Sequence, residues 1–378
     1  MLLAVEFLDE LVYGTREAAW PLIRHDLGLS YAQVALVIAL PGYVSLVAEP
    51  LVGVLADRGR RRALILAGGV LFVATTAAFG LVTGFATLLS VEIVAFPASG
   101  AFVGVSQTVL VDEEPRSRER AMAAWTLAGS LGVVVAPLLV VGAIALGGGW
   151  RQVFAGLGPA GLVVVLLVRG LPSSGAPTGE SLRETGLATL RLLRQAEVLR
   201  WLLLLQVAEL MLDVLHSFLA LYLVDVARVG PADAALGVAV WTGAGLAGDA
   251  ALFVVLRRIS GLRYLRWSAL LVLAVYPVFL LAPGLAAKLV ALAALGLLDS
   301  GWYALPQAQL YAAAGARSGA VLTLGTIGGI LGSTLPLGIG LVAGAAGLGT
   351  ALWIPLAAPL LLLAALPRGG RSTDGTRW

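Results

Sequence analysis

The chain has 378 residues, of which 59% are hydrophobic and 12% are charged, and its mean hydropathy is +0.95. Soluble globular proteins contain about 25% charged residues, so this composition excludes a soluble protein and favours an integral membrane protein. The absence of cysteine excludes disulfide bonds and thiolate metal sites, and two histidines are too few for a histidine-rich metal site. The basic residues lie between hydrophobic segments, so the net charge of +3 does not indicate binding to nucleic acid.

The chain divides at its charged clusters, glycines and prolines into twelve apolar segments. A helix that crosses a membrane needs about 20 apolar residues, so we expect an all-α membrane protein with twelve transmembrane helices. The segments cover residues 2–24, 31–56, 63–84, 86–110, 119–146, 150–169, 198–224, 232–256, 264–283, 286–312, 318–346 and 349–366. They leave no room for a soluble catalytic domain, so we do not expect an enzyme.

The connection between the sixth and seventh segments is the longest and begins with the sequence LPSSGAP. Leucines and arginines follow at helical spacing, which predicts a basic amphipathic helix on the membrane surface. We therefore expect a six-helix bundle at residues 1–170, a cytoplasmic linker at 171–197, a second six-helix bundle at 198–368 and a cytoplasmic tail at 369–378.

Lysine and arginine are enriched in the cytoplasmic loops of membrane proteins. If the N-terminus is cytoplasmic, 20 of the 25 basic residues face the cytoplasm, four face the other side and Arg16 lies inside the first segment. The four are Arg24, Arg151, Arg228 and Lys288. We therefore expect a cell-membrane protein with both termini in the cytoplasm.

The two predicted bundles are related by an internal repeat. Shifting the chain by 200 residues aligns polar and glycine positions without a gap: Glu49 with Asp249, Gln107 with Gln307, Gly129 with Gly329, and Gly132 with Gly332. Two pseudo-symmetric six-helix halves in the same orientation are typical of transporters whose substrate site lies near the bilayer midplane.

The second segment ends with residues 53–62, whose sequence is GVLADRGRRR. It resembles the cytoplasmic loop signature of the major facilitator superfamily, although Gly59 follows Arg58 directly. Together with twelve spans, a central linker and a duplicated half, the resemblance covers nearly the whole chain. It implies transport by alternating access and a cytoplasmic gate at Gly53, Asp57 and Arg58, because an aspartate beside arginines forms charge-assisted hydrogen bonds. The alternative is that the arginines only anchor the topology.

Two weaker similarities suggest efflux. Residues 6–28 are similar to the start of fosmidomycin-resistance-type carriers, whose His-x-x-x-Asp pair falls on Glu6 and Glu10. In the fifth segment, Gly129, Gly132 and residues 136–137 partly resemble the glycine- and proline-rich antiporter motif. The alternative for these small residues is that they let two helices approach closely.

The first segment has a polar face along its whole length. At 3.6 residues per turn, seven polar and aromatic residues project within about 120° of one another. They are Glu6, Asp9, Glu10, Tyr13, Arg16, Glu17 and Trp20. An ionisable side chain at the centre of a membrane helix costs about 2.5–3.5 kcal/mol, so we expect this face to line an aqueous cavity. The alternative is that Arg16 only neutralises Asp9 or Glu17.

The seventh segment has a similar face, formed by Gln206, Glu209, Asp213 and His216. The family resemblance implies that the first, fourth, seventh and tenth spans line the central cavity. Crowded carboxylates in a low dielectric repel one another, so we expect proton carriers, in order of preference Asp9, Glu10, Glu209 and Asp213. The alternative for His216 is a structural pair with Asp213.

Other polar residues in the spans extend this hypothesis. Glu49 and Asp249 are predicted to be a second pair of proton or cation sites, or else structural acceptors. In the fourth and tenth spans, cavity positions are predicted at Glu92, Gln107, Asp299, Trp302, Tyr303 and Gln307. Aromatic rings beside a carboxylate suit a cationic or amphipathic ligand, and the alternative is that they pack between helices. Many proton-coupled members have an arginine in the fourth span; here Arg16 could replace it.

These observations predict a monomeric secondary active transporter, driven by the proton gradient without a cofactor or metal. We expect efflux of a small amphipathic or cationic compound in exchange for protons. The alternatives are proton-coupled symport or facilitated uptake of a metabolite or lipid-like molecule, and, from a different class, a non-transporting membrane receptor or scaffold. An enzyme is not expected, because no catalytic motif stands out.

Overall fold

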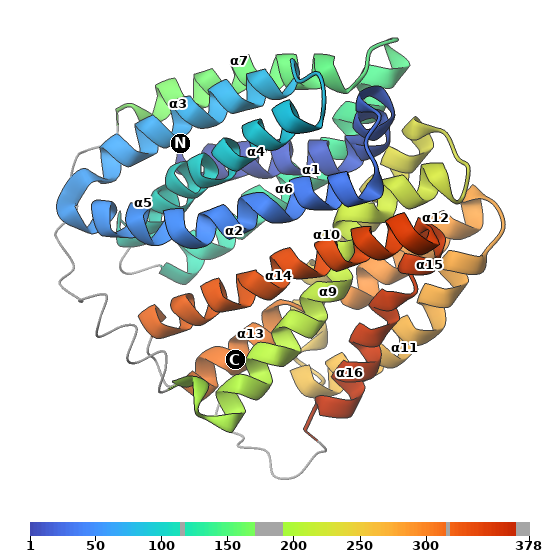
Figure 1. Cartoon of the computed structure of the whole chain (residues 1–378). Helices are drawn as coiled ribbons and strands as arrows, with labels where there is room; N and C mark the ends of the chain where they lie inside the picture. The colour runs from blue at the N-terminus through green and yellow to red at the C-terminus, as the bar shows by residue number, and fades with distance from the viewer. Residues whose placement is uncertain (114–117, 171–191, 315–317, 368–378) are drawn as a thin grey trace. The chain divides into compact units, whose positions relative to one another are not determined.

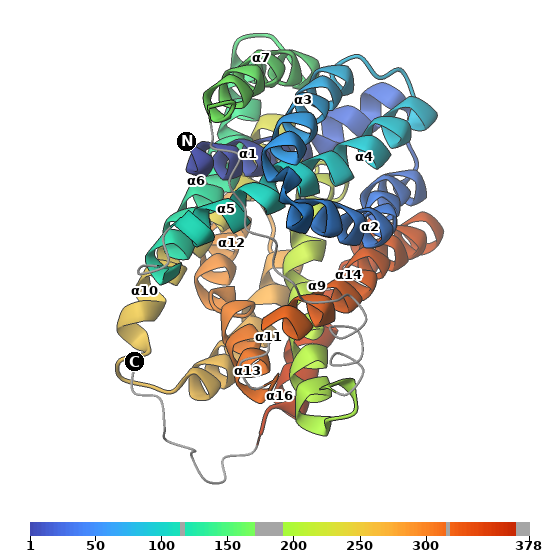
Figure 2. The same ribbon diagram turned by 90° about the vertical axis from the view of Figure 1, so that its left-hand side faces the viewer.

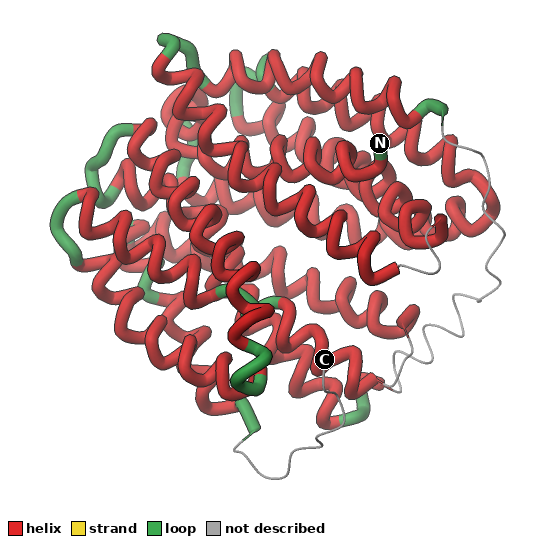
Figure 3. The backbone as a smooth tube through the Cα atoms, turned by 180° about the vertical axis from the view of Figure 1, so that it is seen from behind, coloured by secondary structure: helices red, strands yellow, loops and turns green. Residues whose placement is uncertain are grey.

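The structure is a computed structural model that describes residues 1–113, 118–170, 192–314 and 318–367. All regular secondary structure in these ranges is helical (Figure 3). Asp57 lies in a described helix, but its side chain lies outside the described residues. Most of the predicted amphipathic helix of the linker, and the tail at residues 369–378, also lie outside them.

The first six predicted segments form seven α-helices (Figure 1). They are α1 (Leu2–Leu27), α2 (Tyr31–Leu55), α3 (Arg61–Phe79), α4 (Phe85–Ser99), α5 (Val105–Glu113), α6 (Arg118–Ala145) and α7 (Trp150–Val168). The fourth segment is divided into α4 and α5 by the π-helical turn Gly100–Gly104. A second π-helical turn, Ala56–Arg60, joins α2 to α3.

The last six segments form the remaining helices. They are α9 (Ala196–Asp225), α10 (Pro231–Val255), α11 (Gly261–Leu281), α12 (Leu285–Asp299), α13 (Ala304–Ala314), α14 (Ser318–Ala346), α15 (Leu348–Ala351) and α16 (Ala357–Ala365). The tenth segment is interrupted at residues 300–303, between α12 and α13. Each of the twelve predicted segments therefore contains helix, and the all-α fold class is confirmed.

Ten helical stretches among the described residues are long and apolar enough to cross a membrane. The first segment is not among them, because α1 contains the row of acidic and basic residues noted above. The side chains of the first part of α14 are not described, and Gly332–Ala346 counts as a shorter apolar helix. The count agrees with a protein that crosses the membrane many times.

The molecule divides into two compact units. Unit 1 contains the described residues of Met1–Gly179, Ser217–Ala239 and Pro336–Leu348, and unit 2 contains those of Glu180–His216, Val240–Leu335 and Gly349–Trp378. The predicted bundle boundaries at residues 171–197 stay a prediction.

The turn between α1 and α2 follows from three residues. Gly28 ends α1 with φ 62°, a left-handed conformation that glycine adopts without steric cost. Ser30 then begins α2 with a capping box: the Gln33 amide donates to Ser30 Oγ at 3.2 Å and the Ser30 amide donates to Gln33 Oε1 at 2.9 Å. This compact turn places Tyr31 at the first position of α2.

Within unit 1, α1 lies along α6 (Figures 1 and 2). The helices approach closely because the facing residues are small. A Cβ atom on Gly132 would lie 2.6 Å from the backbone oxygen of Phe7, and a Cβ atom on Gly14 would lie 2.9 Å from Cβ of Ala136. The small residues of the fifth segment therefore provide close helix packing.

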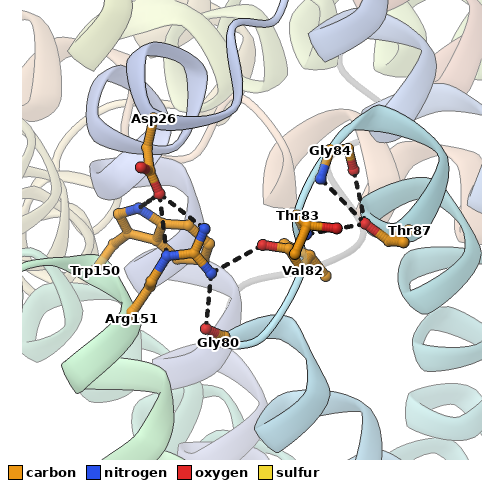
Figure 4. Close-up of polar contacts among 8 residues, drawn as sticks. All are labelled: Asp26, Gly80, Val82, Thr83, Gly84, Thr87, Trp150 and Arg151. Carbon is orange, nitrogen blue, oxygen red and sulfur yellow. Dashed lines mark hydrogen bonds and ion pairs between the residues drawn. The ribbon is translucent and has the colours of Figure 1, made fainter.

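A basic residue holds the C-terminal end of α3, where carbonyl groups lack helical partners. Arg151 at the start of α7 donates from Nη1 to the carbonyls of Gly80 at 2.9 Å and Val82 at 2.8 Å (Figure 4). In unit 2, Lys288 Nζ similarly donates to the carbonyls of Phe279 at 2.8 Å and Leu280 at 3.2 Å. Two of the four basic residues predicted on the outer side therefore have structural roles.

Candidate functional site

A cavity of about 220 Å³ lies within unit 1, between α1, α3, α4 and α7. Polar and aromatic side chains dominate its lining: Asp9, Glu10, Tyr13, Arg16, Phe72, Thr75, Thr76, Phe79, Glu92, Phe96, Ser99 and Phe154. The predicted polar face of α1 contains five acidic or basic residues, and three of them, Asp9, Glu10 and Arg16, are at the cavity.

Arg16 is the basic residue of this cavity, and carboxylates from two helices hold it. Its Nη1 atom donates to Glu92 Oε2 on α4 at 2.6 Å, and its Nε and Nη2 atoms each donate to Glu17 Oε1 at 3.2 Å. Its guanidinium carbon lies 5.0 Å from the centroid of the Tyr13 ring. Trp20 Nε1 donates to the second oxygen of Glu17 at 3.1 Å. Arg16 therefore pairs with Glu17, one of the two predicted partners, and also with Glu92.

Asp9 and Glu10 occupy the other part of the polar lining. Ser99 on α4 donates a hydrogen bond from Oγ to Asp9 Oδ1 at 2.7 Å. With Glu92, these acids give the cavity lining three carboxylates and one guanidinium, that of Arg16. Since ionised carboxylates are costly in a low-dielectric interior, this excess of acid suits the binding of protons or of a cationic group.

Three predicted cavity residues of α1 lie outside this lining. Glu6 faces α6, where a Cβ atom on Gly129 would lie 2.7 Å from Glu6 Oε1. Glu17 is 1% exposed and Trp20 is fully buried. Part of the predicted polar face is thus packed: Glu6 lies beside α6, and Glu17 and Trp20 are buried. That the whole face lines one cavity stays a prediction.

In unit 2, the predicted polar face of α9 lies against glycines of α14. Gln206 Nε2 donates to Glu209 Oε2 at 2.5 Å, and a Cβ atom on Gly328 would lie 2.7 Å from Gln206 Nε2. A Cβ atom on Gly332 would lie 3.9 Å from Asp213 Oδ2. The glycines thus make room for the polar side chains of α9.

Trp241 on α10 links two predicted residues that are far apart in the sequence. Its ring meets the ring of His216 edge to face at a centroid distance of 5.1 Å. Its Nε1 atom donates to Asp299 Oδ2 at 3.0 Å, and Asp299 is 6% exposed. Sequence reasoning missed Trp241, because a tryptophan in an apolar helix shows no sign of the partner it will meet.

The predicted cavity residues Trp302 and Tyr303 of the tenth span lie in different surroundings. Trp302 is fully buried and donates from Nε1 to Ser268 Oγ at 2.9 Å, whereas Tyr303 is 46% exposed and accepts a 2.8 Å hydrogen bond from Gln307 Nε2. The helix is interrupted at residues 300–303, where Gly301 has φ 75°, so these residues do not follow one regular helix. Trp302 is therefore a packing residue.

Glu49 and Asp249 each lie beside the interruption of a neighbouring span. A Cβ atom on Gly100, in the π-helical turn of the fourth span, would lie 3.6 Å from Glu49 Cγ. The backbone N–H of Gly301, in the interruption of the tenth span, donates to Asp249. These equivalent positions agree with the internal repeat and fit the predicted alternative of structural acceptors.

The predicted cytoplasmic gate is described only in part. Gly53 is exposed near the end of α2, and Arg58 is exposed in the π-helical turn Ala56–Arg60, where Gly59 has φ 80°. Gly59 is therefore a residue with a left-handed backbone conformation within the π-helical turn between α2 and α3. The gating role of Asp57 stays a prediction.

Gln107, a predicted cavity residue of the fourth span, lies half-buried on α5.

Comparisons with known proteins agree with this architecture. Residues 2–333 match the family model of the Major Facilitator Superfamily. The multidrug export protein EmrB of Haemophilus influenzae is 30% identical over 165 residues, which are 43% of this chain and 32% of that protein. The chain thus matches about a third of the length of this curated relative.

Several solved transporters have a similar fold. A bacterial homolog of the human lysosomal transporter Spinster, inward-facing and occupied, has a TM-score of 0.78 at 18% identity, covering 97% of this chain and 94% of that one. The nucleoside transporter NupG has a TM-score of 0.77 at 14% identity, covering 97% of each chain. A mutant of the peptide transporter POT has a TM-score of 0.73 at 18% identity, covering 97% and 93%. The twelve predicted segments, the all-helical fold and the match over residues 2–333 show that the chain belongs to the Major Facilitator Superfamily and is a membrane transporter, not an enzyme.

Proposed function

We propose that this transporter exports a small amphipathic or cationic compound in exchange for protons, by alternating access. The observation that carries the proposal is the cavity of about 220 Å³, whose lining contains Asp9, Glu10 and Glu92 together with Arg16. The cavity combines acidic groups for protons with aromatic walls for an organic compound.

The contacts of Arg16 support proton exchange at Asp9 and Glu10. The guanidinium is already held by Glu92 and Glu17, with N–O distances of 2.6 and 3.2 Å. Asp9 accepts its hydrogen bond from the neutral hydroxyl of Ser99. A carboxylate without a direct ion pair in the membrane interior gains by binding a proton or a cation. The two acids are therefore suited to alternate between a proton and a cationic substrate.

The walls of the cavity support an organic cation. Phe72, Phe79, Phe96 and Phe154 line it together with Tyr13. Aromatic faces attract cations by about 0.5–2 kcal/mol each, and the nearby carboxylates supply the opposite charge. The similarity to part of EmrB, named a multidrug export protein, is consistent with efflux of this kind.

We further propose Glu209 and Asp213 as the carriers of the second half, because both lie on the face of α9 beside the glycines of α14. Glu49 and Asp249 are proposed as a further pair, with the structural role as the alternative. The transporter is proposed to be a monomer in the cell membrane, with both termini cytoplasmic, since 20 basic residues lie on that predicted side.

Reconstitution in liposomes that contain a pH-sensitive dye tests the proposal. With an imposed proton gradient, cationic, anionic and lipid-like compounds are added in turn, and we expect proton release only with an amphipathic or cationic one. Asp9→Asn and Glu10→Gln should abolish the release. The matched control is Asp233→Asn, which removes a solvent-accessible acid at the start of α10.

The outcomes separate the alternatives. If a compound crosses the bilayer without moving protons, the proton coupling is wrong and the acids bind substrate or another cation. If protons and compound move in the same direction, the protein is a symporter. If Asp233→Asn is as defective as Asp9→Asn, the loss does not come from the cavity.

A further inference from the structure

The turn between α10 and α11 in unit 2 concentrates positive charge. It joins two helices that are each long and apolar enough to cross a membrane. Four arginines lie in the turn and the first residues of α11: Arg257, Arg258, Arg263 and Arg266. The sequence contains no acidic residue between Asp249 and Asp299. The turn therefore has no carboxylate of its own to neutralise these charges.

The corresponding turn of the first half is different. At the offset of 200 residues, Arg257 takes the place of Asp57. In the first half, Arg62 also donates from Nη2 to the carbonyl oxygen of Arg169 at 2.7 Å, which holds the start of α3 at the end of α7. The second half thus replaces the acid of the turn by a further base.

The arginines of this turn face outward from the protein. Arg257, Arg258 and Arg263 are exposed, and Arg266 is half-buried. Among the described residues, the ion pairs are formed by other arginines, and none involves these four. An anion that neutralises the exposed guanidinium groups therefore has to come from outside the described part of the chain.

The neighbouring side chains indicate where in the bilayer the turn lies. On α10, Phe253 is 77% exposed and lies one turn before Arg257. On α11, Trp267 is 61% exposed one turn after Arg263, and Leu271 is exposed one turn further. Tryptophan is enriched where the hydrocarbon meets the headgroups. The arginines beyond these rings therefore lie at the level of the lipid headgroups.

The first turn of α11 adds to the attraction for an anion. Ser260 occupies the N-cap position, but its side chain makes no capping hydrogen bond. The backbone N–H groups at a helix N-terminus and the positive end of the helix dipole favour a phosphate group. The exposed arginines lie on both sides of this N-terminus in the sequence. They supply the formal charge that the helix end alone lacks.

We propose that Phe253, Arg257, Arg258, Arg263 and Trp267, here named the α10–α11 patch, bind an anionic phospholipid. Guanidinium groups are suited to bidentate hydrogen bonds with a phosphate, and the two exposed rings supply apolar contacts for the adjoining part of the lipid. The occupant is an anionic lipid because the patch has charge of one sign and lies beside apolar, membrane-facing residues. This binding is a property beyond substrate transport and is independent of proton coupling.

A single fluorescent probe in the α10–α11 patch tests the proposal. The chain has no cysteine, and Ser260 is exposed without a capping bond, so Ser260→Cys accepts one bimane label at the patch. The labelled full chain in detergent is titrated with phosphatidylglycerol or phosphatidylcholine. Phosphatidylglycerol should change the fluorescence with an affinity about tenfold higher. Arg257→Gln and Arg263→Gln should each weaken its binding about three- to fivefold.

Arg228→Gln is the matched control, because it removes an exposed arginine outside the patch, and it should leave the affinity within about twofold. Equal affinity for the two lipids would overturn the proposal, as would equal weakening by Arg228→Gln. Inorganic phosphate is added as a competitor. If it displaces phosphatidylglycerol at the same concentration, the occupant is a free anion and the lipid proposal is wrong.

Circular dichroism checks that every variant is helical. If the glutamine variants do not fold, the two lipids and phosphate compared on the labelled Ser260→Cys protein decide. The readout needs neither a proton gradient nor a transported compound. A failure of proton-coupled export in liposomes is therefore distinguishable from a failure of lipid binding.

Discussion

Arg16 and Glu92 form an ion pair with an N–O distance of 2.6 Å, although 76 residues separate them in the sequence. The side chains are 11% and 5% exposed, so the pair lies in the interior of unit 1. It fastens α1 to α4 beside the acidic cavity. The fourth span thus supplies the acid of this pair, and the arginine comes from the first span.

Glu92→Gln should destabilise the protein. The change leaves Arg16 with Glu17 as its acidic partner, and a buried charge that loses one partner costs about 1–3 kcal/mol. Thermal unfolding in detergent should show a lower midpoint than the wild type. Glu197→Gln, at the exposed start of α9, is the control and should not shift the midpoint. An unchanged midpoint for Glu92→Gln would show that the pair contributes little.

Glu6→Gln should retain substrate-dependent proton release. The family resemblance aligns Glu6 with the histidine of a His-x-x-x-Asp pair, but the structure places its carboxylate beside Gly129 of α6, and Glu6 is not in the cavity lining. Asp9→Asn, measured in the same liposomes, should lose the release. If Glu6→Gln behaves like Asp9→Asn, the carboxylate of Glu6 takes part in coupling despite its position.

Gly132→Ala should unfold more easily than the wild type. Its Cβ atom would lie 2.6 Å from the backbone oxygen of Phe7, and overpacking of this kind costs about 1–3 kcal/mol. Gly142→Ala on the same helix is the control, because among the described residues nothing besides its own helix backbone lies within 4 Å of its Cβ position. Thermal unfolding of both variants in one detergent should separate them, and equal midpoints would contradict the close packing of α1 on α6.

Trp241→Phe should destabilise unit 2. Phenylalanine keeps a ring beside His216 but removes the donor to the buried carboxylate of Asp299, at a cost of about 1–3 kcal/mol. Trp267→Phe, at a position 61% exposed, is the matched control. Resistance to denaturation, followed by circular dichroism, should fall only for Trp241→Phe. A similar fall in both variants would indicate a general effect of losing a tryptophan.

Much of the fold could be predicted from the chain because the bilayer restricts the answer. Only long apolar helices satisfy every backbone group within hydrocarbon, so hydropathy and charge located all twelve segments to within a few residues of the observed helices. The repeat of 200 residues placed Glu49 and Asp249 at equivalent positions, and the structure finds each beside an interruption of a neighbouring span.

The local pattern of α1 and α9 also identified charged side chains that need partners. It did not identify the partners. Asp9, Glu10 and Arg16 do meet at one cavity, but Glu6 lies beside α6. Trp302, which lies in the interruption of the tenth span, packs against Ser268. A projection at constant angle per residue cannot anticipate an interruption.

The sequence by itself therefore determined the membrane fold, the transport family and the acidic character of the first span, because these depend on composition, period and motif. Tertiary structure alone decided that Arg16 binds Glu92, that Trp241 joins His216 to Asp299, and that Asp225 holds Arg24 and Tyr31. Such pairs join helices that are distant in the chain. Which residues pair depends on how each helix is rotated against its neighbours. Small residues such as Gly132 and Gly340 determine that rotation, because they allow close packing.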